Sequence, residues 1–103
     1  MYKITFYVPV THVEIVKSAM FTAGAGQIGD YECCAWQILG VGQFRPLAGS
    51  SPFIGKNGTL EYVAEYKVEM VCAEAFLQGA VAALKQSHPY QVPAYDVVQT
   101  IKI

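Results

Sequence analysis

The stretch Gly40-Val-Gly-Gln-Phe-Arg-Pro-Leu-Ala-Gly49, continued by Pro52-Phe-Ile-Gly55, is a glycine- and proline-rich segment that separates two runs of β-type sequence. A second segment of similar character, His88-Pro-Tyr-Gln-Val-Pro-Ala-Tyr-Asp96, lies near the other end of the chain. Loops of this kind in so small a domain usually serve binding or assembly rather than folding. The two segments mark where function is expected, although they disclose no reaction.

Four runs around these segments have the pattern of β-strands. Alternate residues of the first run are apolar, and Pro9 ends it. In the third run Tyr66, Val68 and Met70 are expected to face the core, with charged residues between them facing away. The expected strands cover residues 2–8, 33–41, 61–71 and 94–103.

Two further segments have apolar residues at helical spacing. The first is expected to begin with a capping box, Thr11-His-Val-Glu14, and to run to about Ala23, where Gly24 stops it. The second runs from about Glu74 to Ser87, before Pro89. Its expected buried residues are Phe76, Leu77, Ala80, Val81 and Leu84.

The resulting order, βαββαβ, predicts an α+β fold of the ferredoxin-like type. In this sandwich a four-stranded antiparallel sheet, in strand order 4-1-3-2, carries both helices on one face. Residues 1–103 are expected to form a single domain, without linker, repeat or low-complexity segment.

This topology brings a candidate ligand site to one end of the sheet. His12 at the start of the first helix, Arg45 in the long loop, and His88 and Tyr90 in the turn after the second helix should meet there. His12 and His88 could ligate a divalent metal, or hold a small anion beside the Arg45 guanidinium. The alternatives are that each histidine is tied to a backbone carbonyl and that Arg45 forms a structural or intersubunit salt bridge.

Other motifs point to no chemistry. Gly24-Ala-Gly-Gln-Ile-Gly29 matches the dinucleotide fingerprint, but it follows a helix and precedes a strand, so no helix N-terminus faces a phosphate there. Cys33 and Cys34 are adjacent on an expected strand, so their side chains should point to opposite faces, and Cys72 stands alone. No nucleophile with a nearby base stands out, and no catalytic activity of its own is expected.

Composition limits the partners of the chain. The sequence is 53% hydrophobic and 15% charged, with a net charge of −1, and its mean hydropathy is +0.30. This apolar balance favours a homo-oligomer, as does a strip of small residues, Ala75, Gly79 and Ala82, on the outer face of the second helix. Phe21 is expected as a second exposed apolar group. Scattered basic residues argue against nucleic acid, and no apolar run is long enough to span a membrane.

The cysteines and the first residues predict the compartment. Three cysteines without framework spacing are typical of a reducing cytoplasm. Met1-Tyr-Lys-Ile-Thr-Phe6 has the pattern of a strand rather than of a signal peptide.

A family resemblance covers nearly the whole sequence. Its motifs are Val8-Pro9, His12-Val-Glu14, Gly24-Ala-Gly-Gln-Ile-Gly-Asp-Tyr31, Cys34, Gly40-x-Gly-x-Phe-Arg-Pro46, Gly49, Pro52-Phe-Ile-Gly55, Gly58-x-Leu-Glu61, Glu69, His88-Pro-Tyr90 and Pro93-Ala-Tyr-Asp96. Together they resemble the insert domain of the NIF-three family, also called YqfO-like or the GTP cyclohydrolase type-two homologues.

The resemblance implies a PII- and CutA-like domain, which is ferredoxin-like and trimeric in those proteins. It also implies that the long loop corresponds to their mobile ligand- or partner-sensing loop. The dinuclear metal site of the family lies in two flanking lobes that these residues do not include, so no hydrolase activity is expected of them. Gln91 stands where the family often has Glu, which removes one carboxylate ligand from that turn.

Three functions remain open from the sequence. The first is a small cytoplasmic oligomer, most simply a trimer, that binds an anion, a metal ion or a partner through its loops. The second is a purely structural or protein-interaction module, and the third, with the fewest supporting residues, is a metal-dependent hydrolase.

Overall fold

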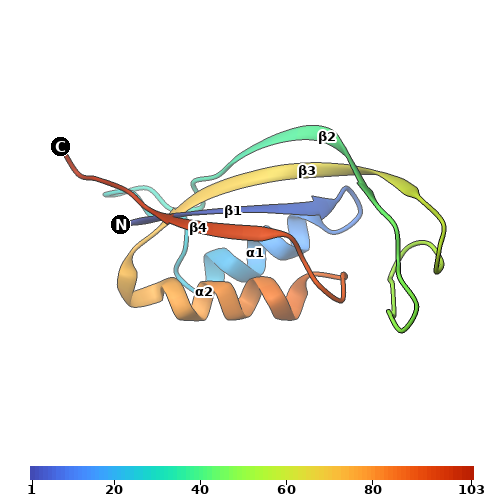
Figure 1. Ribbon diagram of the computed structural model, residues 1–103. Helices are drawn as coiled ribbons and strands as arrows, with labels where there is room; N and C mark the ends of the chain where they lie inside the picture. Colours follow the sequence, from blue (N-terminus) through green and yellow to red (C-terminus); the bar gives the residue numbers. More distant parts are fainter.

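The computed structural model describes all residues, 1–103. The elements in chain order are β1 (Tyr2–Pro9), α1 (Val13–Thr22), β2 (Trp36–Phe44), β3 (Glu61–Cys72), α2 (Glu74–Ser87) and β4 (Tyr95–Gln99). The strands form one sheet in the order β2-β3-β1-β4, with every neighbouring pair antiparallel. Both helices lie under the same face of this sheet, and the opposite face is open (Figure 1). The ferredoxin-like architecture and the strand order predicted from the sequence are confirmed.

The core lies between the sheet and the two helices. Ile4 and Phe6 of β1 pair with Met70 and Val68 of β3, so their side chains share the helix-facing side. The buried apolar residues are Ile4, Phe6, Val8, Val13, Val16, Met20, Ala25, Val68, Met70, Cys72, Ala80 and Leu84. This single cluster fixes the sheet against the helices and thereby positions the loops at both ends.

Three strand boundaries differ by at least three residues from those expected from the sequence, one of them the end of β2, which lies at Phe44 instead of about Val41. β2 begins at Trp36 instead of Cys33, because Cys33 adopts a left-handed backbone with φ of 58°. The Cys34 N–H donates to the carbonyl of Gly26, 2.9 Å away, instead of joining the sheet. β4 ends at Gln99, and the apolar residues that follow are exposed.

The expected capping box at the start of α1 is wrong. The residue at the helix N-cap is His12, and no side chain caps this end. The Thr11 hydroxyl lies 2.8 Å from Nδ1 of His12, and the Glu14 carboxylate pairs with Lys17 Nζ at 3.0 Å. A turn precedes the helix, in which the His12 N–H donates to the Pro9 carbonyl at 2.9 Å. This turn shifts the start of the helix by one residue.

The burial of two phenylalanines also corrects the sequence analysis. Phe76, expected in the core, is 44% exposed, whereas Phe21, expected on the surface, is half-buried against the core. Each ring covers a glycine with positive φ: a Cβ on Gly24 would lie 2.6 Å from Phe76 Cγ, and one on Gly26 would lie 2.8 Å from Phe21 Cδ1. The glycine turn after α1 thus provides the surface on which both rings rest.

The molecule is elongated along its strands. The β2–β3 hairpin extends beyond the helices and ends in a long loop, residues 45–60, which we call the β2–β3 loop (Figure 1). The radius of gyration is 14.5 Å, against about 12.8 Å for a typical domain of this length. The two termini lie together at the opposite end, where the Thr100 N–H donates to the Met1 carbonyl at 3.0 Å. Neither helix is long and apolar enough to cross a membrane.

Candidate functional site

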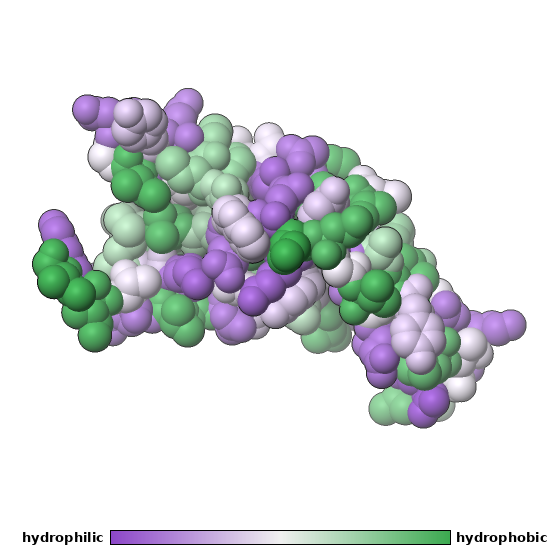
Figure 2. Space-filling view, turned by 90° about the horizontal axis from the view of Figure 1, so that it is seen from above, coloured by the Kyte–Doolittle hydropathy of each residue, from purple (hydrophilic) through white to green (hydrophobic).

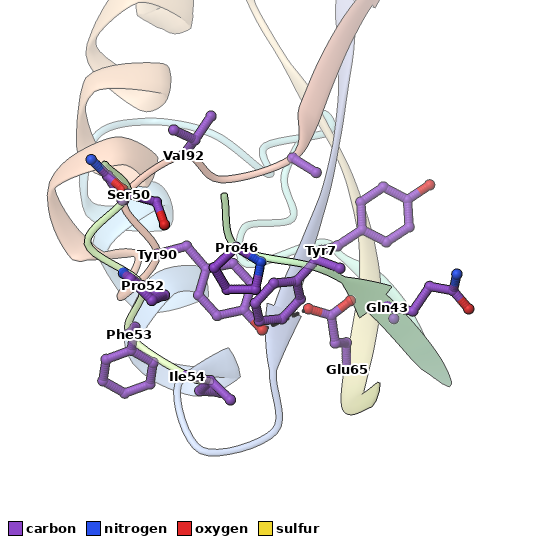
Figure 3. A pocket seen from close by; sticks show the side chains of 14 residues that line it. Tyr7, Gln43, Pro46, Ser50, Pro52, Phe53, Ile54, Glu65, Tyr90 and Val92 are labelled. Carbon is purple, nitrogen blue, oxygen red and sulfur yellow. Dashed lines mark hydrogen bonds between the residues drawn. The ribbon is translucent and has the colours of Figure 1, made fainter. Parts of the chain in front are cut away.

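A pocket lies where the β2–β3 loop folds back toward the segment after α2, residues 88–94, which we call the turn segment (Figure 3). We call it the loop pocket; its volume is about 320 Å³, within the range of small-molecule sites. Its lining residues come from β1, β2, β3, the β2–β3 loop and the turn segment: Tyr7, Gly42, Gln43, Phe44, Pro46, Ser50, Pro52, Phe53, Ile54, Glu65, Tyr90, Gln91, Val92 and Ala94. Strands of the rigid sheet therefore form its floor, and two loops form its walls.

Hydrogen bonds hold the walls in place. The Ser51 N–H donates to Oε1 of Gln91 at 2.9 Å, which ties the β2–β3 loop directly to the turn segment. Within the loop, the Gly58 N–H donates to the Pro46 carbonyl at 2.7 Å, and the Ser50 hydroxyl donates to the Leu47 carbonyl at 2.7 Å. Internal hydrogen bonds therefore fix the conformation of the β2–β3 loop, in addition to its hydrogen bond with the turn segment.

Glu65 and Tyr90 form the polar centre of the loop pocket. The Tyr90 hydroxyl donates to Oε2 of Glu65 at 2.8 Å (Figure 3). Burial, together with this hydrogen bond and the charge of Glu65, raises the pKa of Tyr90 well above its usual range, so Tyr90 remains a phenol at neutral pH. The carboxylate lies so close over Gly42 that a Cβ there would overlap its Oε1. Glycine at position 42 thus makes room for the Glu65 side chain.

Aromatic side chains surround this centre. The ring centroids of Phe44 and Tyr90 are 6.1 Å apart, and those of Phe53 and Tyr90 are 6.4 Å apart. The His12 ring meets Phe53 edge to face at 5.4 Å, and so extends the cluster to the first turn of α1. The wall of the pocket is consequently apolar and rich in ring faces.

His88 holds the base of the turn segment. Its Nε2 lies 2.7 Å from the Tyr7 carbonyl, which can only accept, so Nε2 carries the proton. Its Nδ1 then accepts from the Tyr90 N–H at 3.1 Å. Burial lowers the pKa of His88 even though the Tyr7 carbonyl and the Glu65 charge favour the protonated ring. His88 is thus a neutral ring whose two nitrogens are both satisfied by backbone groups.

The structure brings three of the four candidate residues from the sequence together. His88 and Tyr90 are in contact, with ring centroids 4.8 Å apart, and Phe53 links Tyr90 to His12. Arg45 belongs to the same end of the molecule, but it is exposed, forms no ion pair and does not line the pocket. Of the four residues only Tyr90 lines the pocket, and ligand contacts by all four remain predictions.

No group of three or more histidine, cysteine, aspartate or glutamate side chains is arranged to hold a metal ion. The cysteines lie toward the other end of the sheet, where Cys34 borders a shallow hollow with Lys3, Trp36 and Glu69. Cys72 is buried in the core, and burial raises the pKa of its thiol. No cysteine therefore takes part in the loop pocket.

Sequence reasoning missed the floor of the pocket. Tyr7 and Glu65 follow the alternation that places side chains on the open face, where each would be taken for an ordinary surface residue. One feature of the sequence could have indicated them. Gly40 and Gly42 lie on the same open face of β2; Gly40 is paired with Glu65, and Gly42 is its diagonal neighbour. Two glycines in succession on one face leave a hollow in the sheet.

Sequence comparison relates the chain to longer proteins. It is 46% identical over 97 residues to a GTP cyclohydrolase 1 type 2 homologue of Halalkalibacterium halodurans, covering 94% of this chain and 26% of the relative. A protein of the same name from Bacillus subtilis is 43% identical over 95 residues, 92% of this chain and 26% of the relative. The chain thus spans about a quarter of the length of these relatives. No family model matches it.

Solved structures agree with this relationship and with the fold. A Bacillus cereus protein related to NIF3 superposes with a TM-score of 0.79 at 38% identity, over 93% of this chain and 24% of that one. CutA1 from Pyrococcus horikoshii superposes with a TM-score of 0.70 over 100% of this chain and 86% of its own. Its identity is only 16%, so this likeness concerns the fold alone.

Proposed function

We propose that this chain is an oligomeric binding module without catalytic activity of its own. The proposal starts from its membership of the NIF-three family, as a PII- and CutA-like insert-type domain. The ligand would bind in the loop pocket, between the β2–β3 loop and the turn segment. The observation that carries this proposal is the composition of that pocket. Residues of the sheet form its floor, and a hydrogen bond between Ser51 and Gln91 connects the two loops that form its walls. Rigid elements that present loops in this manner are typical of binding sites.

No nucleophile with an adjacent base lines the pocket, which supports binding over catalysis. Its one carboxylate, Glu65, accepts from a phenol that stays protonated at neutral pH, and no histidine lines the pocket. A candidate hydrolase needs a positioned base or metal beside the reacting atoms. The name of the longer relatives is therefore no guide to the activity of these residues alone.

Exposed apolar surface supports self-association, most simply as a homotrimer. The accessible surface is 6577 Å², against about 5,700 Å² for a typical monomer of this mass. β2 is an edge strand, and both of its faces carry exposed apolar side chains: Trp36, Ile38, Leu39 and Val41. An open edge of this kind is an energetic liability unless another chain covers it.

Arg45 and His12 remain the proposed contacts for an anion or a partner at the outer side of the β2–β3 loop. Arg45 has no acidic partner within the chain, and Nε2 of His12 forms no hydrogen bond with the protein. Metal binding would have to use His12 without His88, because both nitrogens of His88 are engaged. A location in the cytoplasm agrees with the three free cysteines.

One set of measurements on untagged protein tests the proposal. Native mass spectrometry, with metal analysis of the same sample, gives the oligomeric state and any bound ion. Backbone NMR spectra recorded with small cationic, neutral and anionic compounds show whether amides around the loop pocket shift. A trimer with shifts confined to the pocket supports the module. A monomer, or an oligomer whose pocket amides respond to no compound, contradicts it and favours the purely structural alternative.

A further inference from the structure

The loop pocket carries a single formal charge. Among its lining side chains Glu65 is the only acid, and no lysine, arginine or histidine is present. The remaining polar lining consists of uncharged amide and hydroxyl groups, such as those of Gln43, Ser50 and Gln91. The potential inside the pocket is therefore negative, and an anion would meet repulsion without a compensating donor cation.

Glu65 has no cationic partner within the chain. The ion pairs of the protein join Lys3 and Lys67 to Glu69 and Lys17 to Glu14, and none includes Glu65. The carboxylate is half-buried at the base of a largely apolar pocket, yet only the Tyr90 hydroxyl compensates it. A partly desolvated charge of this kind is most stable beside an opposite charge.

The geometry leaves one side of the carboxylate ready for such a partner. The Tyr90 hydroxyl occupies Oε2, and Oε1 accepts no hydrogen bond from any group of the protein. Oε1 fills the space that a Cβ of Gly42 would occupy, and it keeps access to the pocket, because no fully buried side-chain oxygen of the protein lacks a hydrogen bond. Glu65 is therefore held in a fixed orientation by Tyr90, with its second oxygen unoccupied.

The aromatic wall selects the type of cation. Rings of Phe44, Phe53 and Tyr90 lie with centroids 6.1–6.4 Å apart and at tilted angles. Ring faces stabilise weakly hydrated cations such as quaternary ammonium and guanidinium groups. A divalent metal ion instead needs several oxygen or nitrogen ligands, and the protein offers no such group of side chains.

We propose that the loop pocket binds a small organic cation, an ammonium or guanidinium group, with Glu65 as its counter-ion and the aromatic wall around it. The proposal rests on the proposed function, because it names the ligand class of the same pocket. A volume of about 320 Å³ accommodates a compact ligand of this class. The cation either belongs to a free small molecule or is carried by a protein side chain, for example Arg45 of a second copy.

The test compares choline with its uncharged isostere 3,3-dimethylbutan-1-ol, with methylguanidinium and with inorganic phosphate. Binding is followed by NMR shifts of the Gly42, Glu65 and Tyr90 amides. We expect choline or methylguanidinium to bind at least about fivefold more tightly than the uncharged alcohol, and phosphate not to bind in the pocket. Equal affinity for choline and the alcohol, or stronger binding of phosphate, overturns the cation assignment while the binding function stands. No shift with any compound, in the wild type and in Arg45→Gln alike, overturns both.

Two variants separate the charge from the shape of the pocket. Glu65→Gln keeps an oxygen that accepts from Tyr90 but removes the charge, so it should weaken cation binding at least about fivefold and leave binding of the alcohol unchanged. Glu74→Gln is the matched control, because Glu74 accepts from the Tyr2 hydroxyl at 3.0 Å at the opposite end of the molecule. If E65Q binds choline as tightly as the wild type, or if E74Q weakens it as much, Glu65 is not the counter-ion.

Arg45→Gln distinguishes the two sources of the cation. If Arg45 of a second copy fills the pocket, R45Q should lose the oligomer and bind methylguanidinium more tightly, because the competing side chain is gone. If the ligand is a free molecule, R45Q should keep both the oligomer and the wild-type affinity. Either result supports a cation site, provided that E65Q abolishes the preference for cations.

Discussion

Replacing His88 with alanine would break two hydrogen bonds that close the turn segment. Nε2 donates to the Tyr7 carbonyl at 2.7 Å, and Nδ1 accepts from the Tyr90 N–H at 3.1 Å, in a residue that is only 6% exposed. A buried polar group left without its partner costs about 1–3 kcal/mol. We expect the free energy of unfolding of H88A to fall by that amount, about 1–3 kcal/mol. The corresponding decrease in Tm is about 5–14 °C for a domain of this size.

The same substitution should change how stability depends on pH. Burial lowers the pKa of His88 in the folded protein, whereas the unfolded chain has the usual value of about 6.5. Below about pH 6.5 the unfolded chain therefore takes up a proton that the folded protein does not, and stability falls by at most about 1.4 kcal/mol per pH unit. This loss ends at the folded pKa, below which both states are protonated. H88A lacks the effect, so the stability difference between wild type and variant should shrink as the pH falls from 7 toward 5.

Urea unfolding across this pH range, at one fixed protein concentration, measures both quantities. Ser87→Ala is a suitable control, because the Ser87 hydroxyl donates only to carbonyls of its own helix. The control should keep the wild-type pH dependence. Unchanged stability of H88A near pH 7 would refute the structural role of the ring. An NMR titration that places the His88 pKa above its usual value would refute the sign of the pH effect.

Four further substitutions test other parts of the structure. Gly42→Ala should displace the Glu65 carboxylate, because the new methyl group would occupy its position. Loss of the hydrogen bond from Tyr90 should lower the free energy of unfolding by about 1 kcal/mol. NMR shifts of the Tyr90 ring report the loss of this bond. Gly79→Ala, in open space on α2, should raise stability by about 1 kcal/mol. Gly24→Ala, at φ of 108° under Phe76, should instead lower it by about 1–3 kcal/mol, and denaturant unfolding measures both. Val41→Glu introduces a charge on the edge strand β2, at a side chain that is 77% exposed. The variant should be monomeric by light scattering and should keep the circular dichroism spectrum of the wild type. An intact oligomer would exclude this edge from the interface.

The parts of the fold governed by periodicity could be predicted from the sequence. Alternation in β1 and β3 identified the helix-facing residues, and the βαββαβ order identified the strand order. The same topology correctly brought His12, His88 and Tyr90 to one end. These predictions succeeded because burial of an apolar face leaves one register and one face for each element.

The parts that depend on competition between local hydrogen bonds could not be predicted. Thr11 had the sequence signature of a helix cap, but its hydroxyl bonds to the neighbouring His12 ring. Cys33 had the sequence signature of a strand, but its left-handed backbone continues the glycine turn. The loop pocket depends on how the β2–β3 loop folds back onto Gln91, forty residues away, and no periodic pattern reports such a contact. Its charge could be inferred only once the lining was known.

The position of the termini has a mechanical consequence. β1 and β4 are adjacent antiparallel strands, with Tyr2 opposite Gln99, at the end of the molecule away from the β2–β3 loop (Figure 1). Seen from above, the β2–β3 loop projects from the body at the far end from the C-terminal residues (Figure 2). Polypeptide joined to both termini would hold the domain by two links about 5 Å apart, the spacing of neighbouring strands. Both links would then hold the same end of a molecule 46 Å long, and the β2–β3 loop at the opposite end would stay free of them.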